Sequence, residues 1–403
     1  MCRIVLIYLL LISCLFAEDK ILNIKFSSES VPGMPYKFSM PAGFVQTSPL
    51  KLMSLANPKA EIAVQYSSED NFLWFISNGD KEFELLKSDN SAVKGEFVNG
   101  QSDDVTKVQF KGSAIFEYHH AHEPIGEHKI TDHFLKMAEA KWYVRSAFIH
   151  PLYSPAGKLV TDNFPLDHPH HKGLWFAWTN TKIDGKKVDF WNLGLKQGTV
   201  QFAGYRSVES GSVFSRICAN HNWINFLAAA DSRIALKEVW DLKTFSIPKG
   251  TDSAWLIDLT STQSPQVDIH LPEYRYGGFA YRGAKEWVGD KHIVFSSEGK
   301  TKKDAHTSRG KWIAYSGKID GSFATVAVFS HPQNFRFPEP FRVWPDKGSF
   351  LNIAPSQQGD WDLKKGEVYK WNYRLIIYDG EIDAEWLNKT WEHFSKNLEV
   401  RAL

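Results

Sequence analysis

The chain has 403 residues, of which 43% are hydrophobic, so it is long enough and apolar enough to fold around a large buried core. Its 47 Lys and Arg residues nearly balance its 46 Asp and Glu residues, which excludes a strongly basic surface for nucleic acid or for an anionic membrane. Aromatic residues make up 14%, with 15 Trp among them, and this excess is typical either of an aromatic β-sheet core or of a surface that stacks on sugar rings.

The N-terminus has the order of a secretory signal peptide. Arg3 precedes an apolar run at residues 4–12, and Ala17 offers a small residue for cleavage. The run is too short to cross a membrane comfortably, so the sequence predicts a leader at residues 1–17 and a periplasmic or secreted protein without a transmembrane anchor. The alternative is a lipoprotein anchored at Cys14, because the residues before it resemble a bacterial lipobox. Cleavage after Ala17 leaves one cysteine, Cys218, which we expect to be a buried strand residue and not a nucleophile.

The first region after the leader, residues 18–104, has the pattern of a small β-sandwich. Its strands are expected at residues 62–66, 71–77 and 81–86. The intervening Asn78-Gly79-Asp80 suits a tight hairpin, because Asn and Gly tolerate positive φ. The polar, Gly-containing segment 95–104 is the expected boundary with the next region.

The second region, residues 105–403, repeats short apolar runs between turn signals, which predicts a large antiparallel sandwich of two packed sheets, or supersandwich. Strands are expected at residues 142–149, 174–178, 232–247, 311–330 (two strands around Asp320-Gly321) and 367–378. Residues 382–398 carry apolar side chains near helical spacing and predict a C-terminal amphipathic helix. No glycine pattern of a dinucleotide-binding or P-loop fold is present.

The segment 232–247 shows the clearest strand alternation. One face of it carries Ile234, Leu236, Glu238, Trp240 and Leu242. Four of these five are apolar, so this face is the one expected to be buried.

The densest group of chemically active side chains is Asp167-His168-Pro169-His170-His171-Lys172-Gly173. Pro169 favours an extended backbone at His168, so His168 and His170 are expected on one side and His171 on the other. Two imidazoles on one side could share a metal, or could divide acid, base and substrate-binding roles near neutral pH. The alternative is a surface loop of solvated histidines.

Two further His-Pro steps follow expected strands. His150-Pro151 ends the strand expected at residues 142–149, and His331-Pro332 precedes Asn334. If these strand ends met at one rim, His150 and His331 would join His168 and His170 in one site.

Two charged residues stand among apolar or glycine neighbours. Asp189 lies in Val188-Asp189-Phe190-Trp191 and is expected to act as a base, to orient a histidine, to bind a metal or to be a strand-edge charge. Arg282 ends the glycine-rich segment that begins at Gly277, where it could form a fork to a carboxylate or diol or be a solvated residue at a bulge.

These blocks together resemble the bacterial domain family often labelled "methane oxygenase PmoA". The blocks that carry the resemblance are His150-Pro151-Leu152-Tyr153, residues 167–173, Val188-Asp189-Phe190-Trp191, residues 277–282 and His331-Pro332-Gln333-Asn334, and they span about residues 141–380. Lys172 stands where Arg is common in that family, which keeps the charge but loses bidentate geometry. The resemblance implies an exported protein of bacteria that degrade complex glycans. It does not imply methane oxidation, because this chain has no transmembrane segment after its leader.

The sequence therefore predicts a carbohydrate-active enzyme, a hydrolase or lyase with histidine acid/base chemistry. The expected catalytic residues are His168, His170, Asp189 and His150. The expected substrate-binding residues are His171, Lys172, Trp175, Trp178, Trp191, Arg282, His331 and Asn334. Two alternatives are open: a metal-dependent enzyme, possibly redox-active, with a divalent transition metal on His168 and His170, and a non-catalytic glycan-binding protein. A two-carboxylate glycosidase is less well supported, since no convincing carboxylate pair is evident.

Overall fold

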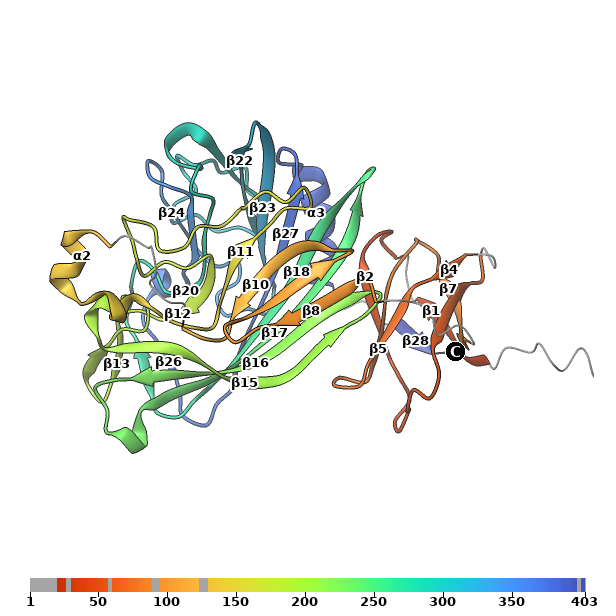
Figure 1. The fold of residues 1–403 in the computed structure, drawn as a ribbon, viewed down its shortest axis with the longest axis horizontal. Helices are drawn as coiled ribbons and strands as arrows, with labels where there is room; N and C mark the ends of the chain where they lie inside the picture. The colour runs from red at the N-terminus through yellow and green to blue at the C-terminus, as the bar shows by residue number, and fades with distance from the viewer. Residues whose placement is uncertain are drawn as a thin grey trace, which may run out of the picture. The chain divides into compact units, whose positions relative to one another are not determined.

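The computed structural model describes residues 20–26, 30–56, 60–88, 95–122, 130–396 and 400–402, the last three by their backbone alone. The predicted leader at residues 1–17, with Cys14, lies outside the described residues. The chain forms two compact units (Figure 1). The first comprises residues 1–95, 211–213 and 397–403, and the second comprises residues 96–210 and 214–396.

The first unit is a small sandwich of two antiparallel sheets, as predicted. The sheets have the strand orders β28-β1-β7-β3-β4 and β2-β6-β5. The strands are β1 (Lys20–Phe26), β2 (Pro35–Ser39), β3 (Leu50–Ser54), β4 (Glu61–Ile62), β5 (Val64–Ser67), β6 (Phe72–Ile76), β7 (Glu82–Lys87) and β28 (Val400–Ala402). Aromatic side chains from both sheets form the core, and the Phe26 ring packs on Tyr36 and Phe83 at 4.8 and 5.8 Å between centroids.

The hairpin predicted at Asn78-Gly79-Asp80 is wrong. The strands on either side, β6 and β7, belong to different sheets of this unit. Gly79 has a φ of 99°, but Asn78 is not among the residues with positive φ, and a two-residue type I′ hairpin needs both. The Asp80 carboxylate instead accepts hydrogen bonds from Ser54 and Asn78, which stabilises a crossover between the sheets.

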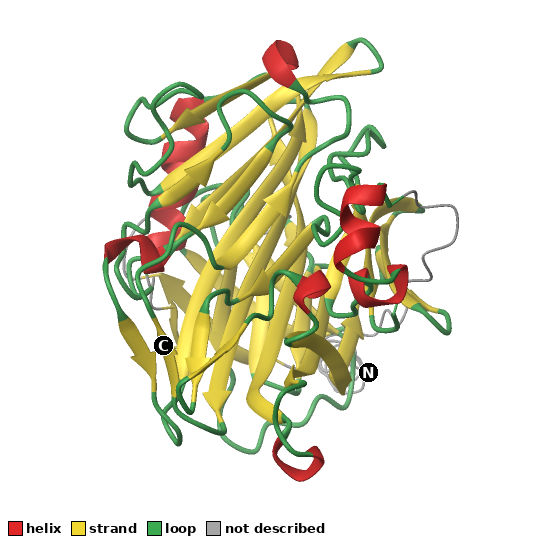
Figure 2. Ribbon diagram, turned by 90° about the vertical axis from the view of Figure 1, so that its left-hand side faces the viewer, coloured by secondary structure: helices red, strands yellow, loops and turns green. Residues whose placement is uncertain are grey.

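The second unit is built on two eight-stranded antiparallel sheets, which confirms the predicted supersandwich (Figures 1 and 2). Sheet 1 has the order β24-β25-β20-β12-β11-β10-β9-β8, with β8 (Phe97–Gln101), β9 (Val105–Phe110), β10 (Ser113–His119), β11 (Phe148–Leu152), β12 (Leu174–Ala177), β20 (Gly278–Arg282), β24 (Phe341–Val343) and β25 (Phe350–Ile353). Sheet 2 has the order β15-β16-β17-β18-β27-β23-β22-β21, with β15 (Gly198–Ser210), β16 (Phe214–Asn225), β17 (Ile234–Lys249), β18 (Asp252–Pro265), β21 (His292–Ser296), β22 (Trp312–Ile319), β23 (Ser322–Ser330) and β27 (Tyr369–Asp379). A third sheet, β14-β13-β19-β26, joins β13 (Thr181–Ile183), β14 (Lys186–Val188), β19 (Ile269–Leu271) and β26 (Trp361–Leu363). Strand β8 pairs with β9 in this unit, although the predicted boundary assigned it to the first region.

The main core lies between sheets 1 and 2. In strand β12 successive side chains point to opposite faces of sheet 1. Leu174 and Phe176 enter the main core, whereas Trp175 and Ala177 join a separate cluster on the other face. We call that second face the outer face. The same alternation recurs in β20, β24 and β25, so the outer face of sheet 1 has a side-chain layer of its own.

Strand β17 confirms the alternation expected for residues 232–247. Leu236, Trp240 and Leu242 are buried in the main core, and so is Glu238. The Glu238 carboxylate is accommodated because it accepts hydrogen bonds from the side chains of Trp223, Trp240, Ser261 and Gln263 and lies 3.2 Å from His221 Nδ1. Burial raises the pKa of Glu238, but these hydrogen bonds and the charge of His221 outweigh it, and the pKa is lowered.

Two other strand predictions have different outcomes. Asp320 and Gly321 have φ values of 50° and 82° and join β22 to β23 as the predicted two-residue hairpin. The strand predicted at residues 142–149 is wrong in its first half, where a 3₁₀ turn, η1 (Ala140–Tyr143), precedes β11. His150 and Pro151 therefore lie inside β11 and not after it.

The predicted C-terminal helix is confirmed as α3 (Ala384–Ser395). The Asp383 carboxylate caps it by accepting a hydrogen bond from the Trp386 backbone amide at 3.0 Å, and Leu387 and Thr390 are buried. Cys218 is a buried residue of β16, as expected. Across the described ranges, no helix has the length and apolar character needed to span a membrane.

A buried carboxylate beside β23 should make stability depend on pH. Burial raises the pKa of Glu339 to about 7, although hydrogen bonds from Ser330, Asn334 and Tyr373 oppose the shift. The folded state then binds a proton more tightly than the unfolded state, so this contribution to stability is full below pH 4.5 and is lost as the pH rises to about 7. Between these limits, the free energy of unfolding should fall by roughly 3 kcal/mol more in the wild type than in Glu339→Gln, which does not titrate. Urea unfolding of both proteins at several pH values measures this difference, and parallel pH profiles would contradict it.

Candidate functional site

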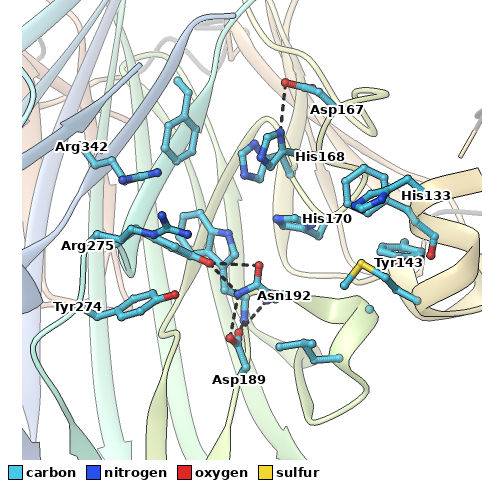
Figure 3. A pocket seen from close by; sticks show the side chains of 18 of the residues that line it. His133, Tyr143, Asp167, His168, His170, Asp189, Asn192, Tyr274, Arg275 and Arg342 are labelled. Atoms are coloured by element: carbon cyan, nitrogen blue, oxygen red, sulfur yellow. Dashed lines mark hydrogen bonds and ion pairs between the residues drawn. The ribbon is translucent and has the colours of Figure 1, made fainter. Parts of the chain in front are cut away.

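A cavity of about 540 Å³ opens on the outer face of sheet 1 (Figure 3). Its walls come from helix α2 (Asp132–Met137), from the His-rich segment before β12, from the turn η2 (Leu193–Leu195) and from the strand ends around Tyr276 and Arg342. The lining residues are His133, Phe134, Met137, Tyr143, Asp167, His168, His170, His171, Lys187, Asp189, Trp191, Asn192, Gly194, Leu195, Tyr274, Arg275, Tyr276, Arg342, Trp344 and Phe350. Segments up to about 200 residues apart in the chain thus meet at one place.

An aromatic cluster on the outer face forms the floor of the cavity. Trp191, Trp344 and Phe350 line it, and Trp175 lies beneath them. Trp175 packs on Trp191 at 4.9 Å between ring centroids, and Trp344 packs on Phe350 at 4.4 Å. The floor is rigid because each of these rings is held by others.

The His-rich segment is not extended as predicted. The backbone amide of His168 donates to the Pro165 carbonyl, and that of His171 donates to the His168 carbonyl, so two turns follow each other. The rings of His168 and His171 consequently stack at 4.7 Å, and His170 meets both edge-on. All three imidazoles line the cavity, instead of two on one side and one on the other.

His168 is held by a carboxylate. Its Nδ1 lies 3.2 Å from Asp167 Oδ2, and Arg282 Nη2 donates to Asp167 Oδ1 at 3.0 Å. Burial would raise the pKa of Asp167, but the hydrogen bond with His168 and the charge of Arg282 outweigh it and lower the pKa to about 2. The His168 side chain is 27% exposed, so a ligand in the cavity can reach it.

His170 and His171 are neutral at pH 7. Burial, together with the charges of His168 and Lys172, lowers the pKa of His170 to about 3. Burial also lowers the pKa of His171 well below its ordinary value. His171 is only 2% exposed and stacks on Phe350 at 4.8 Å, so it belongs to the floor more than to the open space.

The wall opposite the histidines is basic and phenolic. Arg275 and Arg342 each place a guanidinium carbon near the Tyr276 ring, at 5.6 and 5.4 Å from its centroid. Figure 3 shows Arg275, Arg342 and Tyr274 across the cavity from His168 and His170. The Tyr276 hydroxyl accepts a hydrogen bond from Asn192 Nδ2 at 2.9 Å, and burial raises the pKa of Tyr276 to about 12, so its phenol keeps its proton.

Asp189 lines the cavity, but its carboxylate is fully engaged. Oδ1 accepts from the backbone amides of Trp191 and Asn192, and Oδ2 accepts from Thr179 Oγ1 and Asn192 Nδ2, at 2.8 to 2.9 Å. Among the described residues it contacts no imidazole. The expectation that Asp189 orients a histidine is therefore wrong, and Asp167 has that position.

Five predicted site residues lie elsewhere. His150 bonds through Nδ1 to Thr161 at 3.0 Å, and Trp178 donates to Gln263 from inside the main core. Lys172 is fully buried, with Nζ 2.8 Å from the centroid of the Phe164 ring. His331 packs its ring on Phe394, and Asn334 donates to Glu339. The predicted meeting of the His-Pro segments at one rim is thus wrong for His150 and His331, because β11 and β23 belong to different sheets.

Two more predicted binding residues lie next to the cavity without lining it. Trp175 is buried under the floor, and Arg282 lies behind Asp167, where it also borders a second hollow with Lys285 and Asp346. Of the predicted residues, the structure therefore places His168, His170, His171, Asp189 and Trp191 in the cavity wall.

The predicted metal site lacks a ligand set. Within the described ranges, no group of three or more His, Cys, Asp or Glu side chains is arranged to hold a metal ion. The rings of His168 and His170 are 5.6 Å apart and nearly perpendicular, and His168 is paired with Asp167.

The basic wall was not predicted from the sequence. Arg275 and Tyr276 directly precede the Gly277-Gly278 step and could have been inferred from that neighbourhood. Arg342 and Trp344 had a weaker signal, the alternation of β24, in which Phe341 and Val343 enter the main core. Nothing in the sequence places that strand beside the His-rich segment.

Gly173 is the junction on which the site depends. A Cβ at this position would clash with the Ile149 carbonyl oxygen, where the His-rich segment enters β12. Gly173→Ala should therefore lower the free energy of unfolding by about 1–3 kcal/mol. Gly100→Ala is the matched control, since a Cβ there has no heavy atom within 4 Å. Equal unfolding midpoints in guanidinium for the two variants would contradict the close approach.

The fold and the site define a class: a two-sheet β-supersandwich protein with a histidine- and arginine-lined cavity on the outer face of one sheet. The chain belongs to a family of unknown function, DUF6807, whose model matches residues 105–392. The resemblance to the domain family labelled methane oxygenase PmoA stays a prediction. No curated protein matches the chain.

The solved structures that match this chain share very little sequence with it. One is a GH36 α-galactosidase of Geobacillus stearothermophilus, which is 8% identical with a TM-score of 0.33; the match covers 79% of this chain and 41% of that one. Another is a protein in the glycosyl hydrolase family 38 of Enterococcus faecalis, which is 8% identical with a TM-score of 0.40; the match covers 96% of this chain and 48% of that one. A third is a galactose mutarotase related enzyme of Lactobacillus acidophilus, which is 8% identical with a TM-score of 0.30; the match covers 71% of this chain and 100% of that one. This chain thus spans less than half the length of the first two proteins.

Proposed function

We propose that this protein is a carbohydrate-active enzyme that acts on a glycan or oligosaccharide by proton transfer at His168. The observation that carries the proposal is the arrangement of His168, whose Nδ1 lies 3.2 Å from the Asp167 carboxylate and whose ring lines an aromatic-floored cavity. The predicted leader adds that the enzyme acts in the periplasm or outside the cell.

The Asp167–His168 pair has the parts of a general acid/base. A carboxylate 3.2 Å from Nδ1 can orient the imidazole, which leaves Nε2 to exchange a proton with a ligand. Arg282 in turn holds Asp167, so the imidazole is positioned by a chain of two contacts at 3.0 and 3.2 Å. The neutral imidazole of His170 lies beside His168 and can accept a hydrogen bond from the same ligand or donate one to it.

The cavity suits a sugar in size and in surface. Its volume of about 540 Å³ is in the range of small-molecule sites. Trp344 and Tyr276 offer apolar ring surface, and Asn192 adds a polar amide to the cavity wall. This combination matches a ligand with apolar ring faces and hydroxyl edges.

A two-carboxylate hydrolysis is poorly supported. Asp167 and Asp189 are the carboxylates among the described lining residues, and each is already engaged by the protein. A glycosidase of that kind needs one free nucleophile or base and one acid of raised pKa, whereas the pKa of Asp167 is lowered. Proton abstraction from a sugar carbon, as in a lyase or an epimerase, needs one positioned base and fits the site better.

The proposal is tested by incubating the purified protein with a panel of neutral and acidic polysaccharides and their oligosaccharides. Mass spectrometry and reducing-end release measure cleavage, and a change of sugar configuration is followed by NMR. We expect turnover of at least one glycan that requires His168. Failure to bind or modify any member of the panel, with the protein folded, would contradict the proposal.

A further inference from the structure

We propose that the substrate is an acidic glycan, whose uronate carboxylate binds Arg275 and Arg342 while His168 removes the neighbouring carbon-bound proton in a β-elimination. This inference rests on the proposed function and specifies its substrate class and reaction.

Two arginines on one wall of the cavity, Arg275 and Arg342, lack an acidic partner among the described residues. Among the described residues neither guanidinium forms an ion pair, and their recorded contacts are with the rings of Tyr274 and Tyr276. Asp167 and Asp189, the carboxylates of the cavity, are engaged by Arg282 and by four hydrogen bonds, respectively. The cavity therefore has uncompensated positive charge on one wall.

Positive charge is concentrated on this wall of the cavity. Arg342 is half-buried, and its burial and the charge of Arg275 lower the pKa of Arg342. Both guanidinium groups lie within 6 Å of the Tyr276 ring centroid, and the positive charge of Arg275 acts on Arg342, so an anion bound by both would offset that repulsion. Arginine forks match a planar carboxylate in geometry as well as in charge.

A substrate carboxylate bound by the two arginines would lie across the cavity from His168, the proposed base. Arg275 and Arg342 face His168 across the cavity (Figure 3). When a uronate carboxylate is bound by cations, the C–H bond on the adjacent carbon, C5, becomes more acidic, because the developing negative charge is spread onto the carboxylate. The base on the opposite wall can then reach that proton.

The reaction balances with the groups present. His168 Nε2 accepts the proton from C5, the C5–H electron pair forms a C4=C5 double bond, and the C4–O4 bond breaks with its electrons on O4. The proton is returned from His168 to O4, so the products are a 4,5-unsaturated uronate and a free hydroxyl, and no water, oxidant or reductant is consumed.

The test combines binding and product analysis on the full-length protein. Binding of an oligouronate, of its neutral counterpart and of a sulfated neutral oligosaccharide is measured by calorimetry. Arg275→Gln and Arg342→Gln should each weaken oligouronate binding about 10- to 100-fold, the loss expected for one charge-assisted hydrogen bond. Arg233→Gln, on an exposed arginine outside the cavity, is the control and should bind as the wild type does. Product is followed by ultraviolet absorbance of the new double bond.

Each outcome decides one statement. Uronate binding that requires both arginines, with an unsaturated product that requires His168, supports the inference. Turnover of a neutral glycan that is indifferent to the arginines overturns it and leaves the proposed function standing. Equal binding of the sulfated neutral sugar identifies the anion as a sulfate ester and overturns the elimination, since no carboxylate then activates C5. The absence of binding to all three ligands overturns the inference, and the wider panel then decides the proposed function.

Discussion

Replacing His168 by Asn should lower kcat for glycan turnover by about 10²- to 10⁴-fold, the usual contribution of a general acid or base. Asn retains a polar side chain that fits beside Asp167, but it cannot exchange a proton near neutral pH. KM should change little, because the aromatic floor and the basic wall hold most of the ligand. Steady-state kinetics on the substrate found in the panel measures both constants.

Two further variants separate catalysis from folding. His270→Gln removes a histidine of β19 that pairs with Asp362 outside the cavity, and it should leave kcat unchanged. Asp167→Asn removes the charge that pairs with Arg282 and should lower kcat less than His168→Asn, since the base itself remains. A His168→Asn protein that keeps wild-type kcat would refute the assignment of the base.

Replacing Glu238 by Ala should lower the free energy of unfolding by about 3–5 kcal/mol, the cost of breaking a buried charge network. Four side-chain donors and the His221 imidazole surround the carboxylate. The Tyr118 hydroxyl extends the network from sheet 1 to His221 in sheet 2, at 2.7 Å. Truncation leaves these groups unsatisfied in the core and adds a cavity.

Urea denaturation followed by tryptophan fluorescence measures this loss. Glu238→Gln keeps the shape and part of the hydrogen bonding, so its loss should be smaller than that of Glu238→Ala. Glu367→Ala, on an exposed residue beside β27, is the control and should stay within about 0.5 kcal/mol of the wild type. If Glu238→Ala matched Glu367→Ala, the network would contribute nothing to stability.

Much of the fold was predictable because β structure is encoded by local patterns. The alternation in residues 232–247 predicted both strand β17 and its buried face, and Asp320-Gly321 predicted the hairpin between β22 and β23. The same rule was insufficient at Asn78-Gly79, because the turn residues do not reveal which sheet the next strand joins. That choice is made by long-range pairing of β7 with β1 and β3.

The sequence by itself determined the all-β architecture and drew attention to the His-rich segment, since both depend on neighbouring residues. The tertiary structure alone decided which distant residues complete the site. Sheet 1 pairs β12 with β20 and β20 with β25, which brings Arg275 and Trp344 to the cavity beside His168, whereas His331 follows a strand of sheet 2. The orientation of the imidazoles was also decided by tertiary contacts, because two successive turns and the Asp167–Arg282 pair override the extended backbone that Pro169 favours.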